Sequence, residues 1–281
     1  MKLAALAATF VLAACSSKSP APATTTPAPT AAENLPASTG PLSEEEFKAL
    51  HALPKEGTVE LRGQTIDLNG TKAYLSLPAG KGPFPGIVVI HEWWGLNEHV
   101  EHWADRLASA GWAAVAVDLY GGTVATTRDE AMAAMKSVDK AKASATIGNA
   151  IELLAKDPRI EAKTRAVIGW CFGGAWSLQT ALDHPELQGA IIYYGQLETD
   201  PAALRSIKAN VLGIFGNKDK GIPPETVDKF EAGLKEAGVK AEIHRYDAEH
   251  AFANPSNPIY DEKSAGDAWS HVLAFLGSLT S

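Results

Sequence analysis

The chain has 281 residues, and its hydrophobic fraction of 46% is enough for one substantial core. Its formal charge of −8 comes from 33 acidic and 25 basic residues, without a Lys/Arg run of the kind that marks a nucleic-acid surface. The composition therefore excludes a basic nucleic-acid-binding protein. The two cysteines, Cys15 and Cys171, each have a local context of their own, so we expect no disulfide.

The N-terminus has the pattern of a secretory signal. Residues 3–14 are apolar and uncharged, and the run is too short to span a bilayer as a stable helix. It ends in Leu12-Ala13-Ala14-Cys15, which resembles the bacterial lipoprotein signal, in which the cysteine is lipidated and becomes the mature N-terminus. An ordinary secretory signal is the alternative. Lipidation of Cys15 predicts export to the bacterial cell envelope, and Ser16 favours the outer membrane or periplasm over the inner membrane.

Three regions are predicted along the chain. A signal peptide over residues 1–14 is followed by a tether over 15–43, in which residues 20–30 are only Pro, Ala and Thr. Such a segment buries too little apolar surface to fold, and its prolines keep it extended. A folded domain over residues 44–281 completes the chain, beginning with a short helix capped by Ser43-Glu44-Glu45-Glu46.

From about residue 57 strands and helices alternate. Apolar runs predict strands at 59–61, 74–77, 87–90, 113–117, 166–169, 190–194, 211–215 and 241–246. Helical periodicity predicts helices at about 97–110, 128–155, 172–182, 224–237 and 260–276. Repeated β-α units of this length indicate an α/β fold with a mostly parallel sheet and helices on both faces. The connection over residues 195–209 is too short for a sizeable lid.

One segment carries a predicted nucleophile. Gly169-Trp170-Cys171-Phe172-Gly173-Gly174 follows a buried strand and opens a helix, which is the context of a nucleophile elbow. The glycines allow strand and helix to approach closely, and the positive end of the helix dipole favours a thiolate. A buried structural cysteine is the alternative, but it would need neither flanking glycine. We therefore predict that Cys171 is the nucleophile.

A nucleophile needs a base, and the base needs a group that orients it. Asp219 directly follows the strand predicted at 211–215, and His250 lies between the strand predicted at 241–246 and the last helix. Both positions fall at C-terminal strand ends, where ligands bind in open α/β sheets. Either residue alone fits a surface loop. Together with Cys171 they have the order of an α/β-hydrolase triad.

The segment His91-Glu92-Trp93-Trp94-Gly95-Leu96-Asn97 directly follows the strand predicted at 87–90. We expect this loop to supply one N–H of an oxyanion hole, and the residue after the nucleophile to supply the other. The histidines also raise the possibility of a metal site. However, His91-Glu92-x-x-Gly95 is not His-Glu-x-x-His, and His99 and His102 have only i,i+3 spacing, so we predict no metal.

These motifs together resemble the dienelactone hydrolase family over about residues 57–278. The resemblance is carried, in order, by His91-Glu92-Trp93-Trp94-Gly95-Leu96-Asn97, Asp118-Leu119-Tyr120-Gly121, Gly169-Trp170-Cys171-Phe172-Gly173-Gly174, Gly216-Asn217-Lys218-Asp219 and His250-Ala251-Phe252. It implies the α/β-hydrolase fold, with Cys171 as nucleophile, His250 as base and Asp219 as its orienter.

The resemblance also implies further site residues. Glu92 would contact the thiol in the resting enzyme, and the backbone amides of Trp93 and Phe172 would form the oxyanion hole. Family members that act on dienelactone hold its carboxylate with two arginines, one after the Asp-Leu-Tyr motif and one four residues after the catalytic histidine. Here these regions read Gly121-Gly122 and Asn254. An apolar or aromatic-lined cleft is suggested instead, with the candidates Trp93, Trp94, Trp170 and Trp176, and a place in the core is the alternative for each of them.

The implied activity is hydrolysis of a small ester or lactone through a thioester acyl-enzyme. A thiol has a pKa of about 8.5, so leaving groups of similar basicity compete best, which favours enol lactones and aryl esters. The alternatives are a general carboxylesterase or thioesterase, and a non-catalytic binding protein on the same scaffold. No cofactor and no nucleic-acid partner are expected, and membrane contact is expected only through the lipid on Cys15. No oligomeric state follows from the sequence.

Overall fold

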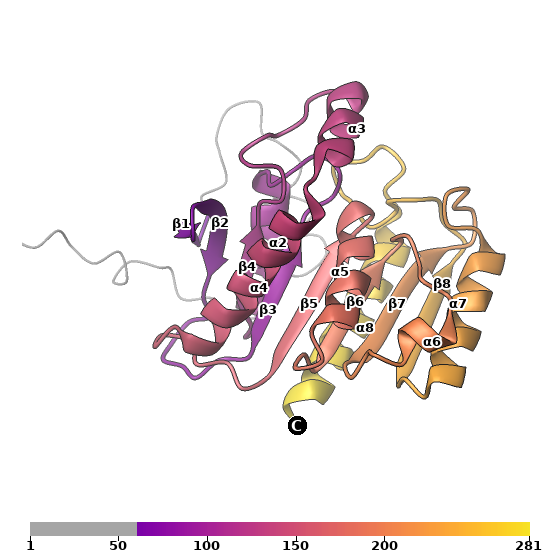
Figure 1. Ribbon diagram of the computed structural model, residues 1–281. Coiled ribbons are helices and arrows are strands. Elements are labelled where there is room, and N and C mark those ends of the chain that lie inside the picture. Colours follow the sequence, from indigo (N-terminus) through magenta and orange to yellow (C-terminus); the bar gives the residue numbers. More distant parts are fainter. Residues whose placement is uncertain (1–60) are drawn as a thin grey trace, which may run out of the picture. The chain divides into compact units, whose positions relative to one another are not determined.

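The computed structural model of the protein describes residues 61–281. The predicted signal peptide, the lipidated Cys15, the tether and the helix capped at residues 43–46 lie outside the described residues. Element labels follow Figure 1.

Eight strands form one sheet in the order β1-β2-β4-β3-β5-β6-β7-β8 (Figure 1). The strands are β1 (Gln64–Leu68), β2 (Thr71–Ser76), β3 (Gly86–Ile90), β4 (Ala113–Val117), β5 (Arg165–Trp170), β6 (Gly189–Tyr193), β7 (Asn210–Gly216) and β8 (Ala241–Tyr246). β2 runs antiparallel to both β1 and β4, and all the other pairs are parallel. The predicted mostly parallel sheet is confirmed.

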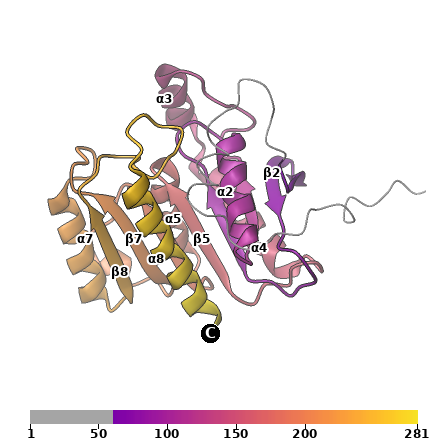
Figure 2. The same ribbon diagram turned by 180° about the vertical axis from the view of Figure 1, so that it is seen from behind.

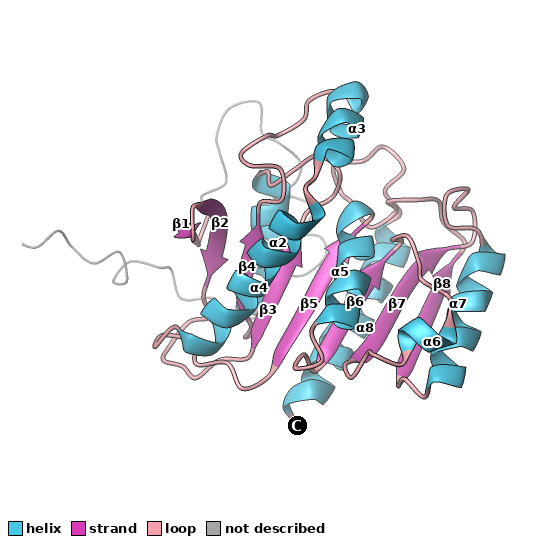
Figure 3. Ribbon diagram, in the orientation of Figure 1, coloured by secondary structure: helices cyan, strands magenta, loops and turns pink. Residues whose placement is uncertain are grey.

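Helices cover both faces of this sheet (Figures 2 and 3). They are α2 (Glu98–Ser109), α3 (Arg128–Ser137), α4 (Lys140–Lys156), α5 (Phe172–Asp183), α6 (Pro201–Leu204), α7 (Pro224–Ala237) and α8 (Glu262–Thr280). α2 and α8 pack their apolar residues into the core on one face, while α4, α5 and α7 do so on the other. β3 and β4 are buried along their whole length, as strands between two helical layers must be.

The C-terminal ends of the parallel strands share one edge of the sheet, where the predicted site residues follow β3, β5, β7 and β8. α3 lies beyond this edge (Figure 1) and buries only Ala131. The connection between β6 and β7 contains only the short α6, so no large insertion covers the edge.

The structure differs from the prediction at two elements, β1 and α6. The first strand was expected at 59–61, but Leu61 lies outside any strand and β1 begins at Gln64. β1 and β2 form a hairpin across Asn69 and Gly70, whose φ angles of 54° and 84° are those that an Asn-Gly turn adopts. The helical segments predicted over about 128–155 are α3 and α4, and Asp139 caps the N-terminus of α4. The short α6 was not predicted.

Among residues 61–281, no helix is long and apolar enough to cross a membrane.

Candidate active site

Cys171 lies at a sharp turn between β5 and α5. Its φ of 55° and ψ of −113° put a non-glycine residue in a region that L-amino acids rarely adopt. The Cys171 amide donates a hydrogen bond to the carbonyl of Tyr193 at 3.0 Å, which ties the turn to the end of β6. The side chain is a free thiol of intermediate exposure. Such strain at a solvent-accessible thiol is typical of a functional position.

Gly173 sets the distance between α5 and the end of β3. A Cβ at this position would lie 2.2 Å from the carbonyl oxygen of Ile90 and 2.6 Å from that of His91. The His91 ring also stacks on Phe172, with the ring centroids 5.5 Å apart and the planes 17° apart. This close approach brings together the two segments that carry the predicted oxyanion-hole amides. The Phe172 amide belongs to the first turn of α5 and has no intrahelical acceptor.

His250 and Asp219 are in direct contact, although they are separated by 31 positions in the sequence. The Nδ1 of His250 lies 2.6 Å from Oδ2 of Asp219, and Asp219 is only 3% exposed. The other carboxylate oxygen of Asp219, Oδ1, accepts hydrogen bonds from the amides of Gly221 at 2.7 Å and Ile222 at 3.1 Å. Three hydrogen bonds therefore fix the carboxylate, and through it the orientation of the imidazole.

The surroundings of His250 favour its protonated form. Burial lowers the pKa of His250, but hydrogen bonds to Asp219 and Cys171, with the charges of both groups, outweigh burial and raise it to about 10. Burial acts against ionisation of Asp219 as well, yet its hydrogen bond to His250 lowers the pKa of the carboxyl below its ordinary value. His250 thus interacts with Asp219 on one side and with Cys171 on the other.

Glu92 points into the same site and contacts Asn254. The Asn254 Nδ2 donates to Oε2 of Glu92, while Oε1 is buried and has no hydrogen-bond partner among the described residues. The amide of Asn254 is held in this orientation because its Oδ1 accepts from the amide of Ser256 at 2.9 Å. Burial raises the pKa of Glu92 to about 7, against the lowering effects of the Asn254 hydrogen bond and of His250.

The raised pKa of Glu92 predicts that the difference in stability between the wild type and Glu92→Gln depends on pH. Between its ordinary value of 4.5 and about 7, Glu92 holds a proton in the folded chain but not in the unfolded chain. Wild-type stability therefore falls as the pH rises through this window, relative to a variant that cannot ionise. We expect the stability of Glu92→Gln relative to the wild type to grow by about 2 to 3 kcal/mol between about pH 5 and about pH 8. Urea unfolding at both pH values measures this difference, and a constant difference contradicts it.

Two tyrosines complete the walls of the site. Tyr194 directly follows β6 with a φ of 36°, and its buried ring lies 5.1 Å from the His250 ring. Tyr120 packs on Phe172 at 5.3 Å, and burial together with the charge of Cys171 raises the pKa of its phenol. Neither tyrosine was assigned a role from the sequence. For Tyr194, its position at the C-terminal end of a strand could have indicated one.

The four candidate cleft tryptophans have different environments. Trp170 is 2% exposed and lies 4.6 Å from Trp103, so for this residue the core alternative holds and not the cleft. Trp176 is partly buried and packs against the core on the face covered by α4, α5 and α7. Trp93 and Trp94 lie together at 5.0 Å in the loop after β3. The Arg128 guanidinium of α3 lies 5.8 Å from the centre of the Trp93 ring.

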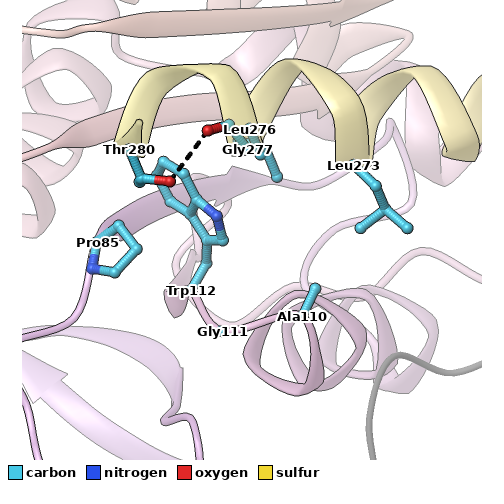
Figure 4. Close-up of a pocket in the computed structure, with 8 residues that line it drawn as sticks. All are labelled: Pro85, Ala110, Gly111, Trp112, Leu273, Leu276, Gly277 and Thr280. Atoms are coloured by element: carbon cyan, nitrogen blue, oxygen red, sulfur yellow. Dashed lines mark hydrogen bonds between the residues drawn. The ribbon is translucent and has the colours of Figure 1, made fainter.

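One cavity in the described part of the chain, of about 260 Å³, touches Tyr120 and Ala134 on the side of the sheet edge that carries Cys171. Another, of about 320 Å³, lies between α2 and α8 next to Pro85 and Trp112, at the N-terminal ends of β3 and β4 (Figure 4). This second cavity is at the opposite edge of the sheet from Cys171 and takes no part in its chemistry. Within residues 61–281, no cluster of three or more His, Cys, Asp or Glu side chains forms a metal site.

Comparison with known proteins gives one consistent family. The sequence profile described as the dienelactone hydrolase family matches residues 71–280. A protein of Methylorubrum extorquens provisionally named carboxymethylenebutenolidase is 30% identical over 215 residues, which cover 71% of this chain and 74% of the relative.

Solved structures agree with this match. A crystal structure provisionally described as a dienelactone hydrolase, from Klebsiella pneumoniae, is 28% identical with a TM-score of 0.71, covering 76% of this chain and 98% of that chain. A dienelactone hydrolase-like promiscuous phosphotriesterase from metagenomic libraries is 26% identical with a TM-score of 0.69, covering 78% of this chain and 97% of that chain.

Proposed function

The chain belongs to the dienelactone hydrolase family and is a carboxylic ester hydrolase, and we propose that it cleaves small esters or lactones through Cys171, His250 and Asp219. The observation that supports this triad best is the 2.6 Å contact between His250 and Asp219 beside the strained Cys171 turn. The alternative within the same class is a general carboxylesterase or thioesterase on another acyl group.

The first half of the reaction forms a thioester. The Cys171 sulfur attacks the carbonyl carbon after its proton has passed to His250, and the carbonyl electron pair moves onto oxygen. The amides of Trp93 and Phe172 donate hydrogen bonds to that oxyanion. When the oxyanion collapses, the bond to the alkoxy or aryloxy oxygen breaks, and this oxygen takes the proton from His250. Asp219 holds the imidazole in the required orientation throughout.

The second half hydrolyses the thioester. His250, now neutral, accepts a proton from water as the water oxygen attacks the thioester carbonyl. The second tetrahedral oxyanion uses the same two amides, and its collapse breaks the carbon–sulfur bond. The acid leaves, and Cys171 and His250 return to their starting state. No cofactor is required by these steps.

The leaving group decides which esters react. In the first tetrahedral intermediate a thiolate and an oxyanion compete to leave, and an alkoxide is far more basic than a thiol of pKa about 8.5. We expect phenyl acetate to be hydrolysed at least about a hundredfold faster than ethyl acetate in kcat/KM, after correction for their uncatalysed rates. A phenol-release and acid-titration assay on both esters measures this ratio, and comparable values contradict the thioester pathway.

The charge around the cleft bears on the substrate class. The position four residues after His250 carries the neutral Asn254 amide, which is already engaged by Glu92. The loop after Tyr120 contains two glycines, Gly121 and Gly122. A neutral amide and two glycines in place of a pair of arginines suit small neutral esters and lactones and do not depend on a substrate carboxylate.

We further propose that Cys15 anchors the enzyme to a membrane of the cell envelope through a lipid. The uncharged run at residues 3–14, the Leu12-Ala13-Ala14-Cys15 sequence and the Pro/Ala/Thr stretch at 20–30 support this proposal. In a bacterial host, the wild type is expected to incorporate labelled palmitate, whereas Cys15→Ser is not. Equal labelling of the two, or labelling of neither, contradicts the anchor.

A further inference from the structure

His91 is a fully buried histidine next to the site, and it has no place in the steps described above. It directly follows β3 and precedes Glu92, so it begins the loop that carries the Trp93 amide. As a polar side chain with 0% exposure, it must have hydrogen-bond partners to be tolerated there.

Both ring nitrogens of His91 have backbone partners. Nδ1 lies 2.5 Å from the carbonyl oxygen of Glu92, and Nε2 lies 3.2 Å from the amide of Leu119. A backbone amide can only donate, so Nε2 is the accepting nitrogen, and Nδ1 carries the proton that is donated to Glu92. His91 is therefore defined as the neutral Nδ1–H tautomer. Burial lowers the pKa of His91 to about 4, against the raising effects of the Glu92 carbonyl and Asp118, which agrees with a neutral ring.

The carbonyl that His91 contacts belongs to the peptide unit that also contains the Trp93 N–H. A trans peptide is planar, and its C=O and N–H point in opposite directions. A hydrogen bond that fixes the carbonyl therefore also fixes the direction of the N–H, and it polarises that N–H toward stronger donation. The Gly95 amide donates to the same Glu92 carbonyl at 3.3 Å, so two hydrogen bonds fix the orientation of this peptide unit.

His91 also contacts the second predicted oxyanion donor. Its ring stacks on Phe172 at 5.5 Å and meets Tyr120 edge to face at 4.6 Å. One imidazole thus joins the loop after β3, the loop after β4 and the first turn of α5.

We infer that His91 is a positioning residue for the oxyanion hole, which aims the Trp93 amide through the Glu92 carbonyl. This inference rests on the proposed function. It gives His91 no contact with substrate and no proton transfer. Its effect is confined to steps in which a tetrahedral oxyanion forms.

Two variants of the full-length enzyme separate the hydrogen bond from the ring. His91→Phe retains the aromatic contacts and removes both polar contacts. His91→Asn loses the ring, but its amide NH₂ can occupy the place of Nδ1 and donate to Glu92. We expect kcat/KM for p-nitrophenyl acetate to fall about tenfold to a hundredfold in His91→Phe, part of the hundred- to thousandfold that loss of a whole oxyanion donor costs. We expect His91→Asn to recover most of that loss.

Alkylation of Cys171 by iodoacetamide supplies the discriminating readout. This displacement needs the nucleophilic sulfur but forms no oxyanion, so its rate is expected to stay within about twofold of wild type in His91→Phe. Cys171→Ala gives the background, and thermal unfolding shows that each variant is folded. A parallel fall of alkylation and hydrolysis overturns the inference, as does unchanged hydrolysis in His91→Phe. A wild type without Cys171-dependent hydrolysis overturns the proposed function itself.

Discussion

Cys171→Ala is expected to reduce p-nitrophenyl acetate turnover by about a thousandfold or more, because no other group at the elbow can form the covalent intermediate. The oxyanion-hole amides and His250 would still bind the ester, so the loss should appear in kcat more than in KM. The measurement compares the full-length wild type and variant under identical conditions.

The variant should also be folded, which makes the comparison interpretable. The turn at residue 171 is tied by its backbone amide to the carbonyl of Tyr193, and this bond does not depend on the thiol. Matching far-ultraviolet circular dichroism and thermal unfolding would establish this. Equal turnover by the two proteins would remove Cys171 from the mechanism.

Gly173→Ala is expected to cost about 3 kcal/mol or more of folding stability. The fraction of the variant that still folds is expected to have lost esterase activity. The added methyl would meet the carbonyl oxygens of Ile90 at 2.2 Å and His91 at 2.6 Å, and both are backbone atoms that cannot rotate away. Either α5 or the end of β3 must move. The first turn of α5 carries the Phe172 amide and the loop after β3 carries the Trp93 amide of the predicted oxyanion hole, so stability and chemistry are damaged together.

Gly277→Ala is the matched control for this substitution. Gly277 lies in α8, where an added Cβ would meet nothing within 4 Å. Replacing glycine by alanine inside a helix is expected to stabilise it by about 0.5 to 1 kcal/mol. Urea unfolding should therefore show a loss of stability in Gly173→Ala and a gain in Gly277→Ala, and esterase activity should fall only in Gly173→Ala. A Gly173→Ala protein as stable and active as the control would contradict the close approach described at the elbow.

Local patterns were enough to predict the parts of the fold that have local causes. The strands at 87–90 and 113–117 are buried on both faces and read as continuous apolar runs, and the helix at 224–237 was placed with its observed bounds. β1 was not predicted, although the Asn69-Gly70 turn that joins it to β2 and determines the hairpin register is a local signal.

The candidate site also contains residues that the sequence could identify and residues that only the fold brings together. The elbow around Cys171 is a local motif, and Asp219 and His250 could be placed because strand ends converge at one edge of a parallel sheet. The contact between Asn254 and Glu92 joins residues 162 positions apart, and no local pattern encodes it. His91 was considered only as a metal candidate, because its hydrogen bonds to the Glu92 carbonyl and the Leu119 amide are invisible without coordinates.

The central claim is a thioester on Cys171, and trapping it is the most direct test. With aryl esters, acylation of Cys171 should be faster than hydrolysis of the acetyl thioester, so the thioester should accumulate. Mixing the enzyme with excess p-nitrophenyl acetate and quenching the reaction in acid should then leave one acetyl group on the protein. Peptide mass spectrometry is predicted to locate it on the peptide that contains Cys171, and neutral hydroxylamine should remove it. An acetyl group on another residue, or an unmodified Cys171 during steady turnover, would contradict the mechanism.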